Sequence, residues 1–246
     1  MGGSRFVVRP TSGRSFAVRR IVRLADMDGR GRLRLDAVAR YLQDTAIEDV
    51  LETGWGLPDH LWFIRRIELE TDTAFLEDRS VEIVTWCSGI AAIAAGRRWS
   101  LRGDAGGRIE VESVWIHLGP DARPARIAGF DLYAEAAEGR PVSTKIDLPA
   151  PPSFAETFSW PLRSTDVDLH GHVNNAVHWQ AVEHRLAHRG FDFAQPSSAR
   201  IDYGDPLSLD DEVELAEWRD DAGYSLAFVV GERIRAFARV QSRARP

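Results

Sequence analysis

The chain has 246 residues, of which 44% are hydrophobic and 28% charged, so it can bury a substantial core. Its formal net charge of −6 argues against binding to the phosphate backbone of nucleic acids. Cys87 is the only cysteine, which excludes an internal disulfide and a cysteine-rich metal site. With neither a signal-peptide pattern nor an apolar run of roughly 20 residues, we expect a cytoplasmic protein with no membrane segment.

The first half begins with a strand-like segment, residues 16–24, followed by the turn sequence Asp-Met-Asp-Gly-Arg-Gly. A helix is expected next, because apolar residues recur at helical spacing over residues 38–46. Asp36 is placed to cap its start, and Gly54 and Gly56 to end it. Four strand-like segments follow, at residues 61–69, 80–87, 97–102 and 109–118.

The second half repeats this order. A strand at residues 158–162 leads to Asp-Val-Asp-Leu-His-Gly, and a helix is expected over about residues 175–187, ended by Gly190. Four strands are then predicted at residues 199–203, 212–218, 224–230 and 234–241.

The two Asp-x-Asp elements lie 140 residues apart, and a repeat of this size indicates a duplicated domain. One long helix followed by a run of antiparallel strands predicts an α+β fold, with each sheet wrapped around its helix. We therefore expect an N-terminal domain over residues 1–135, a linker rich in Ala, Pro and Gly over residues 136–155, and a C-terminal domain over residues 156–246.

Polar residues gather just ahead of the second helix, where Asp168, His170 and His172 fall within five residues. The helix that follows turns its free backbone N–H groups and the positive end of its dipole toward this segment. A carboxylate, imidazoles and N–H donors together can attack a carbonyl group and stabilise the resulting oxyanion. Gly171 would allow close approach of a substrate, and Asn174 or Asn175 could cap the helix.

This segment, Asp168-Leu-His-Gly-His-Val-Asn-Asn, resembles the second-domain motif of the plant and bacterial fatty acyl-ACP thioesterases, where ACP is the acyl carrier protein. In that family the motif reads Asp-x-Asn-x-His-Val-Asn-Asn. The resemblance extends over nearly the whole chain, through Leu42-Gln-Asp-Thr-Ala, Trp62-Phe-Ile-Arg-Arg, the segment from Trp86 to Trp99, and Ser113-Val-Trp. Each fragment alone is weak, and their shared order makes the match specific.

The resemblance implies a double hot-dog fold, with catalysis in the C-terminal half and acyl-chain binding mainly in the N-terminal half. It places the catalytic residues at Asp168 and His172, with His170 where the plant enzymes have Asn, and it adds Asn174 as a catalytic candidate. It implies no metal or organic cofactor. We name as substrate-binding candidates Asn175, Gly171, Arg97 and Arg98.

Two parts of the pattern depart from the family. With Tyr203 aligned, the position of the family's later acid falls on Pro206, and Asp205 lies one residue earlier. Cys87 lies in the first half on a strand-like segment with no neighbouring His, so we expect a buried structural thiol.

The first-half turn has Arg32 where the second half has His172, so we expect it not to catalyse. Arg30, Arg32 and Arg34 form either a solvated charged turn or a surface for an anionic carrier. The expected function is hydrolysis of fatty acyl-ACP by a monomer or homodimer. The alternatives are an acyl-CoA thioesterase, a double hot-dog hydratase or dehydratase, and an acyl-binding protein without activity. The hydratase motif Asp-x-Asn-Pro-x-His is not matched here.

Overall fold

The computed structural model describes residues 6–55 and 61–244, which form three α-helices, two short 3-10 helices and ten strands within the described ranges. The first half contains β1 Ser15–Ile21, η1 Leu24–Asp26, α1 Leu35–Thr53, β2 Leu61–Thr73, β3 Ser80–Ala91, β4 Ala94–Gly103, β5 Arg108–Leu118 and α2 Asp131–Ala137. The second half contains β6 Glu156–Trp160, η2 Ser164–Asp166, α3 Asn175–His188, β7 Ser197–Tyr203, β8 Val213–Asp220, β9 Gly223–Val230 and β10 Arg233–Ser242.

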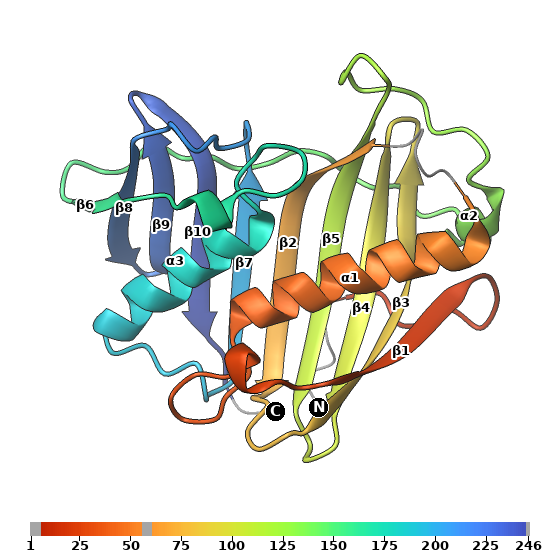
Figure 1. Ribbon diagram of the computed structural model, residues 1–246, viewed down its shortest axis with the longest axis horizontal. Helices are drawn as coiled ribbons and strands as arrows, with labels where there is room; N and C mark the ends of the chain where they lie inside the picture. Colours follow the sequence, from red (N-terminus) through yellow and green to blue (C-terminus); the bar gives the residue numbers. More distant parts are fainter. Residues whose placement is uncertain (1–5, 56–60, 245–246) are drawn as a thin grey trace.

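All ten strands belong to one sheet, in the order β1-β3-β4-β5-β2-β7-β10-β9-β8-β6. The strands of each half stay together, and the halves are joined where β2 pairs antiparallel with β7, with Ile67 opposite Ile201. Figure 1 shows this continuous sheet, with the first half in red to green and the second half in cyan to blue. The halves therefore share one hydrogen-bonded surface.

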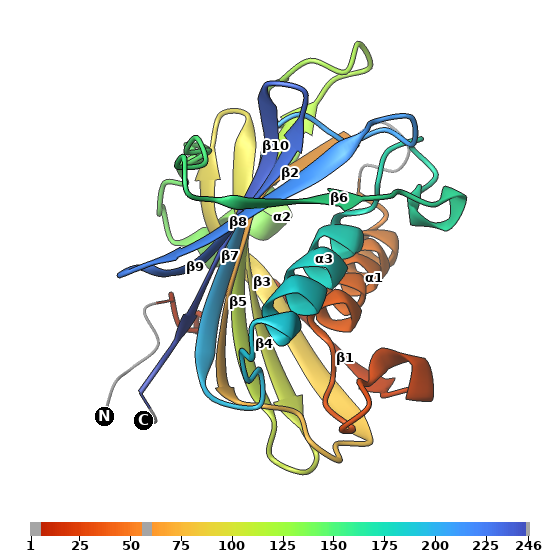
Figure 2. The same cartoon turned by 90° about the vertical axis from the view of Figure 1, so that its left-hand side faces the viewer.

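Helices α1 and α3 lie on the same side of the sheet and contact each other (Figures 1 and 2). A single apolar core lies between the helices and the strands and contains fully buried side chains from both halves, such as Trp99, Trp179 and Ile201. Alternation along the strands turns apolar side chains toward the helices, as expected for a half-covered antiparallel sheet. The predicted α+β fold is confirmed, and the two sheets that we expected, one for each helix, are joined into one.

The predicted N-cap of the first long helix is wrong. Asp36 does not cap α1, because the helix begins at Leu35 after Arg34 as N-cap. Asp36 instead accepts hydrogen bonds from Arg34 and Arg40 inside the first turn. The predicted end at Gly54 is confirmed, since Gly54 takes the left-handed conformation with φ of +64°. Gly56 lies outside the described residues.

Helix α2 was not predicted, although its first residues directly precede the expected linker. It packs against β3, where Tyr133, Ala136 and Ala137 form a small second core with Trp86 and Cys87. No helix in the described part of the chain is long and apolar enough to cross a membrane.

Candidate active site

Each half carries the same tight turn just before its long helix. In the second half, the amide N–H of Asp168 donates to the carbonyl of His172 at 2.9 Å, and Gly171 donates to the carbonyl of Asp168 at 3.0 Å. The first half forms the same two bonds 140 residues earlier, at 2.8 and 3.0 Å. Gly171 and Gly31 both have φ of +77°, a conformation that is costly for residues with a Cβ.

The turn of the second half holds its carboxylate next to solvent. Asp168 is half-buried, and one oxygen accepts the backbone N–H of His170 at 2.9 Å. The side chains of His170 and His172 are exposed beside it. Asn174 is the N-cap of α3, with its side-chain oxygen accepting from Ala176 N at 2.9 Å. The turn therefore presents a carboxylate and two imidazoles at the start of a capped helix.

The turn of the first half has the same backbone hydrogen bonds, but its carboxylate is bonded to an arginine side chain. Asp28 accepts backbone N–H groups from Arg30 and Arg32 and the side-chain Nε of Arg32 at 3.0 Å. Its pKa is lowered because the hydrogen bonds and the charge of Arg32 outweigh its partial burial. Arg32 is itself buried and also contacts Glu183 of α3 at 2.5 Å. The expectation of a solvated turn is therefore wrong for Arg32, while Arg30 is exposed as expected.

A cavity of about 540 Å³ opens at the second-half turn and extends into the first half. On the turn side it is lined by Asp168 through Asn175, except Gly171, and by His178 on α3. On the other side it is lined by α1, the start of β2, and parts of β3, β4 and β5. Its volume lies within the range of small-ligand pockets, and its walls are mainly apolar.

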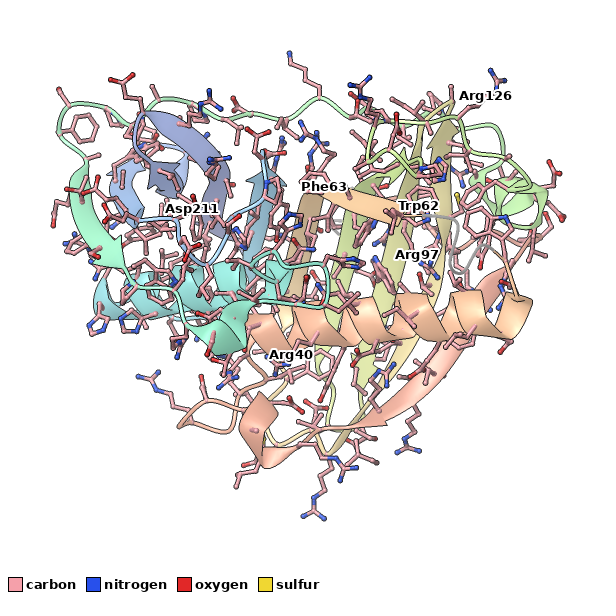
Figure 3. The ribbon with its side chains drawn as sticks, turned by 45° about the horizontal axis from the view of Figure 1, so that its top comes forward. Arg40, Trp62, Phe63, Arg97, Arg126 and Asp211 are labelled. Atoms are coloured by element: carbon pink, nitrogen blue, oxygen red, sulfur yellow. The ribbon has the colours of Figure 1, made fainter. Side chains whose placement is uncertain are left out.

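Aromatic rings line the part of the cavity that lies in the first half. Trp55 contacts Phe130 with ring centroids 5.1 Å apart, and Phe130 stacks on Tyr133 of α2 at 5.0 Å. Trp62 packs against both Trp55 and Phe130. Figure 3 shows Trp62 and Phe63, at the start of β2, above α1. The far part of the cavity is therefore suited to an apolar chain.

The two predicted substrate-binding arginines have different places. Arg97 lines the cavity, where it pairs with Asp49 of α1 and lies over the ring of Trp99 (Figure 3). Arg98 points to the other face of the sheet. It is 2% exposed, pairs with Glu110 at 2.8 Å and is absent from the cavity lining. The structure thus brings only Arg97 to the space that the turn opens into.

Two further candidates are placed by the structure. Cys87 is buried, as expected, and burial raises the pKa of its thiol to about 11. Asp205 lines the cavity but has a 69% exposed side chain, with Arg235 Nη1 3.6 Å away. Neither group is paired with Asp168 or His172.

His178, for which no functional role was predicted from the sequence, lies on the first turn of α3 at the cavity wall. It is fully buried between Tyr203 and Phe228, with ring centroids 5.2 and 4.9 Å away. Burial lowers its pKa to about 4, which makes it neutral near pH 7. Only its position four residues after Asn174, on the cavity side of the helix, could have indicated this.

Comparison with known proteins follows the same two halves. The model of the acyl-ACP thioesterase N-terminal domain matches residues 13–134, and that of the C-terminal domain matches residues 153–235. The chain belongs to the acyl-ACP thioesterase family. The double hot-dog fold expected from the resemblance is that of the family's solved structures.

Individual relatives agree over almost the full length. Two uncharacterized proteins of Mycobacterium tuberculosis, from strains CDC 1551 / Oshkosh and H37Rv, are each 27% identical over 235 residues, which is 94% of this chain and of theirs. Among solved structures, a protein described as an oleoyl thioesterase from Lactobacillus plantarum has a TM-score of 0.78 at 17% identity. It covers 96% of this chain and 98% of its own. The 12:0-ACP thioesterase from Umbellularia californica has a TM-score of 0.76 at 16% identity and covers 95% and 99%.

This acyl-ACP thioesterase is a thioester hydrolase that releases a fatty acid from acyl-ACP. The expected family, fold and reaction are confirmed by the two domain models together. Within the described part of the chain, no group of three or more His, Cys, Asp or Glu side chains is arranged to hold a metal ion.

Proposed function

We propose that this acyl-ACP thioesterase hydrolyses its substrate at the Asp168 turn, with Asp168 as general base. The carboxylate takes a proton from a water molecule, whose oxygen attacks the thioester carbonyl carbon. The carbonyl electron pair moves to oxygen and then returns as the C–S bond breaks. The proton on Asp168 passes to the departing sulfur, so that the products are a fatty acid and the free thiol of ACP.

In this proposal the other turn residues orient the reacting groups. His172 and His170 flank the carboxylate at the cavity and position the water and the thioester. The backbone N–H of Asn175, at the first position of α3, donates to the developing oxyanion. Asn174 acts indirectly, because its side chain holds the helix start through Ala176. Gly171 supplies the left-handed backbone conformation, with φ of +77°, that the turn requires.

The observation that carries this proposal is the contrast between the two turns. The first-half carboxylate, Asp28, is occupied by Arg32, and the helix-start N–H of Leu35 is occupied by Glu183 at 2.7 Å. At the Asp168 turn the matching groups line an open cavity. Only the second turn can therefore offer a base and an N–H donor to a substrate.

We further propose that the acyl chain lies in the first-half part of the cavity. Its walls there are Ala46, Ile47 and Val50 of α1 and the rings grouped around Trp62. Burying an apolar chain against such walls is favourable by roughly 0.8 kcal/mol for each methylene group. The N-terminal half then selects the chain and the C-terminal half breaks the thioester.

The thiol-bearing carrier must approach from the exposed side of the turn, where Leu169 is 88% exposed at the rim of the cavity. Of the arginines predicted to bind the carrier or the substrate, Arg32 and Arg98 are buried in ion pairs, so they cannot contact the carrier. Arg97 lines the interior of the cavity. Arg30 keeps an exposed side chain at the first-half turn.

The test is thiol release from acyl-ACP and acyl-CoA of matched chain lengths from C8 to C18. We expect turnover of acyl-ACP with a preference for one range of chain length, and slower turnover of the CoA esters. Faster turnover of the CoA esters would assign the carrier to CoA instead. Inactivity with every ester on both carriers would contradict the proposed reaction.

A further inference from the structure

Helix α3 of the second half contacts the turn and the helix start of the first half. The carboxylate of Glu183, the ninth residue of α3, accepts two hydrogen bonds. One comes from Arg32 Nη2 at 2.5 Å and the other from the backbone N–H of Leu35 at 2.7 Å. Leu35 is the first residue of α1. A carboxylate from the second half thus occupies the anion-binding start of the first-half helix.

The repeat places Gln43 at the corresponding point of the second-half turn. Gln43 is the ninth residue of α1 and precedes Glu183 by 140 residues, the same spacing that separates the two turns. The residues that correspond to Arg32 and Leu35 are His172 and Asn175. Gln43, His172 and Asn175 all line the same cavity, as this correspondence requires.

The side chain of Gln43 is available for a ligand. It is half-buried, and no hydrogen bond links it to any other group within residues 6–55 and 61–244. A carboxamide differs from a carboxylate in one decisive respect, because its NH₂ group donates hydrogen bonds whereas an ionised carboxylate only accepts them. The first half therefore holds an acceptor at this point, and the second half holds a donor.

We propose that Gln43 is a catalytic residue of the Asp168 site. Its side-chain Nε2–H and the backbone N–H of Asn175 together donate to the thioester carbonyl oxygen and to the oxyanion that forms from it. This assignment rests on the proposed function of the Asp168 turn. It makes the active site a joint product of both halves, because the base comes from the C-terminal turn and one oxyanion donor comes from α1.

The position of Glu183 supports this geometry. Its carboxylate oxygen lies 2.7 Å from Leu35 N, which is the distance expected between an oxyanion and its donor. The helix start of the first half thus binds an acceptor oxygen from within the protein, whereas the equivalent residue Asn175 borders the cavity. Loss of one oxyanion donor typically lowers kcat by about 10²- to 10³-fold.

The experiment compares Gln43→Ala and Gln43→Glu with the control Asp44→Ala in the full-length protein. Asp44 is the next residue of α1 and is exposed. We measure kcat and KM with acyl-ACP, and confirm folding by circular dichroism and urea unfolding. Gln43→Ala should lower kcat by about 10²- to 10³-fold, as expected for loss of a donor that acts in the transition state. Asp44→Ala should leave kcat within threefold.

Gln43→Glu gives a sharper readout, because the new carboxylate would accept from Asn175 N as Glu183 does from Leu35 N. It should lower kcat at least as much as Gln43→Ala at pH 8, and part of the loss should be recovered as the pH falls and the carboxyl group becomes a donor. A folded Gln43→Ala with kcat within threefold of wild type would overturn the proposal, as would a change confined to KM. Asp168→Asn, run in parallel, distinguishes the two proposals: full activity in that variant refutes the site itself, whereas its inactivity with an active Gln43→Ala refutes only the role of Gln43.

Discussion

The two Asp-x-x-Gly turns share a backbone and differ in what surrounds it. In the first half, Asp28, Arg32, Glu183 and the backbone N–H of Leu35 are bonded to one another within the protein. Around Asp168 the matching groups border a cavity of about 540 Å³. The comparison teaches that the turn alone is not a catalytic element. A carboxylate at a helix start becomes catalytic when its neighbours leave room for a substrate.

The strongest test of this comparison replaces the two aspartates separately. Asp168→Asn keeps the size of the side chain and removes the base, so kcat should fall by about 10²- to 10⁴-fold. Asp28→Asn removes one partner of Arg32, so it should reduce stability while kcat stays within a few-fold. The measurement is kcat for both variants with circular dichroism as the folding control. Near-full activity of Asp168→Asn, or loss of activity in a folded Asp28→Asn, would contradict the assignment of catalysis to the C-terminal half.

A second test asks whether the first-half turn stabilises the folded protein through its contact with α3. Arg32→Met leaves Glu183 buried without its cation, and breaking a buried ion pair in this way costs about 3–5 kcal/mol of unfolding free energy. Burial already raises the pKa of Glu183 even beside Arg32. The double variant Arg32→Met/Glu183→Gln should therefore recover much of the loss, since the buried Glu183 carboxylate is then replaced by a neutral carboxamide and only the partly exposed Asp28 lacks its cation. Urea unfolding measures both, and equal stability of wild type and Arg32→Met would contradict a structural role.

A smaller effect is expected on the pH dependence of stability, and it comes from the start of α3 and not from the start of α1. The pKa of His178 falls from 6.5 to about 4 on folding, so the unfolded chain takes up this proton first as the pH falls. The stabilising effect of neutral His178 is complete above pH 6.5 and is lost between pH 6.5 and 4. A shift of this size corresponds to about 3 kcal/mol. The position equivalent to His178 in α1 is Val38, which does not titrate.

The variant His178→Phe keeps an aromatic ring between Tyr203 and Phe228 and removes the proton site. Its unfolding free energy, measured in urea at pH 7 and pH 4.5, should fall less with acid than that of the wild type. An identical fall in both proteins would show that other groups, such as the buried carboxylates, account for the acid sensitivity.

The sequence predicted the repeat, the fold and the Asp168 turn because each depends on local patterns. Strand periodicity, helix spacing and the turn sequence are all contained in short stretches of chain. It failed where the deciding contact is distant. Arg32 looked like part of a solvated turn, because Glu183, which buries it, lies 151 residues further along.

The same limit explains the remaining errors. Asp36 has the residue type of a helix cap, but its pairing with Arg34, Arg40 and Gln180 places it inside the first turn instead. Arg97 and Arg98 are neighbours in sequence, yet alternation along β4 sends one to the cavity and the other to the opposite face. Gln43 could have been found only by asking what residue lies 140 positions before Glu183.

Joining the halves in one chain also frees them from having to be alike. Two identical subunits would present the same residue at the ninth position of both long helices. A Gln there would leave two open sites, and a Glu would close both. In a tandem chain the two positions are encoded separately and can differ, and here position 43 is Gln while position 183 is Glu. The covalent connection thus permits a division of labour in which one turn fastens the helices together and the other meets the substrate.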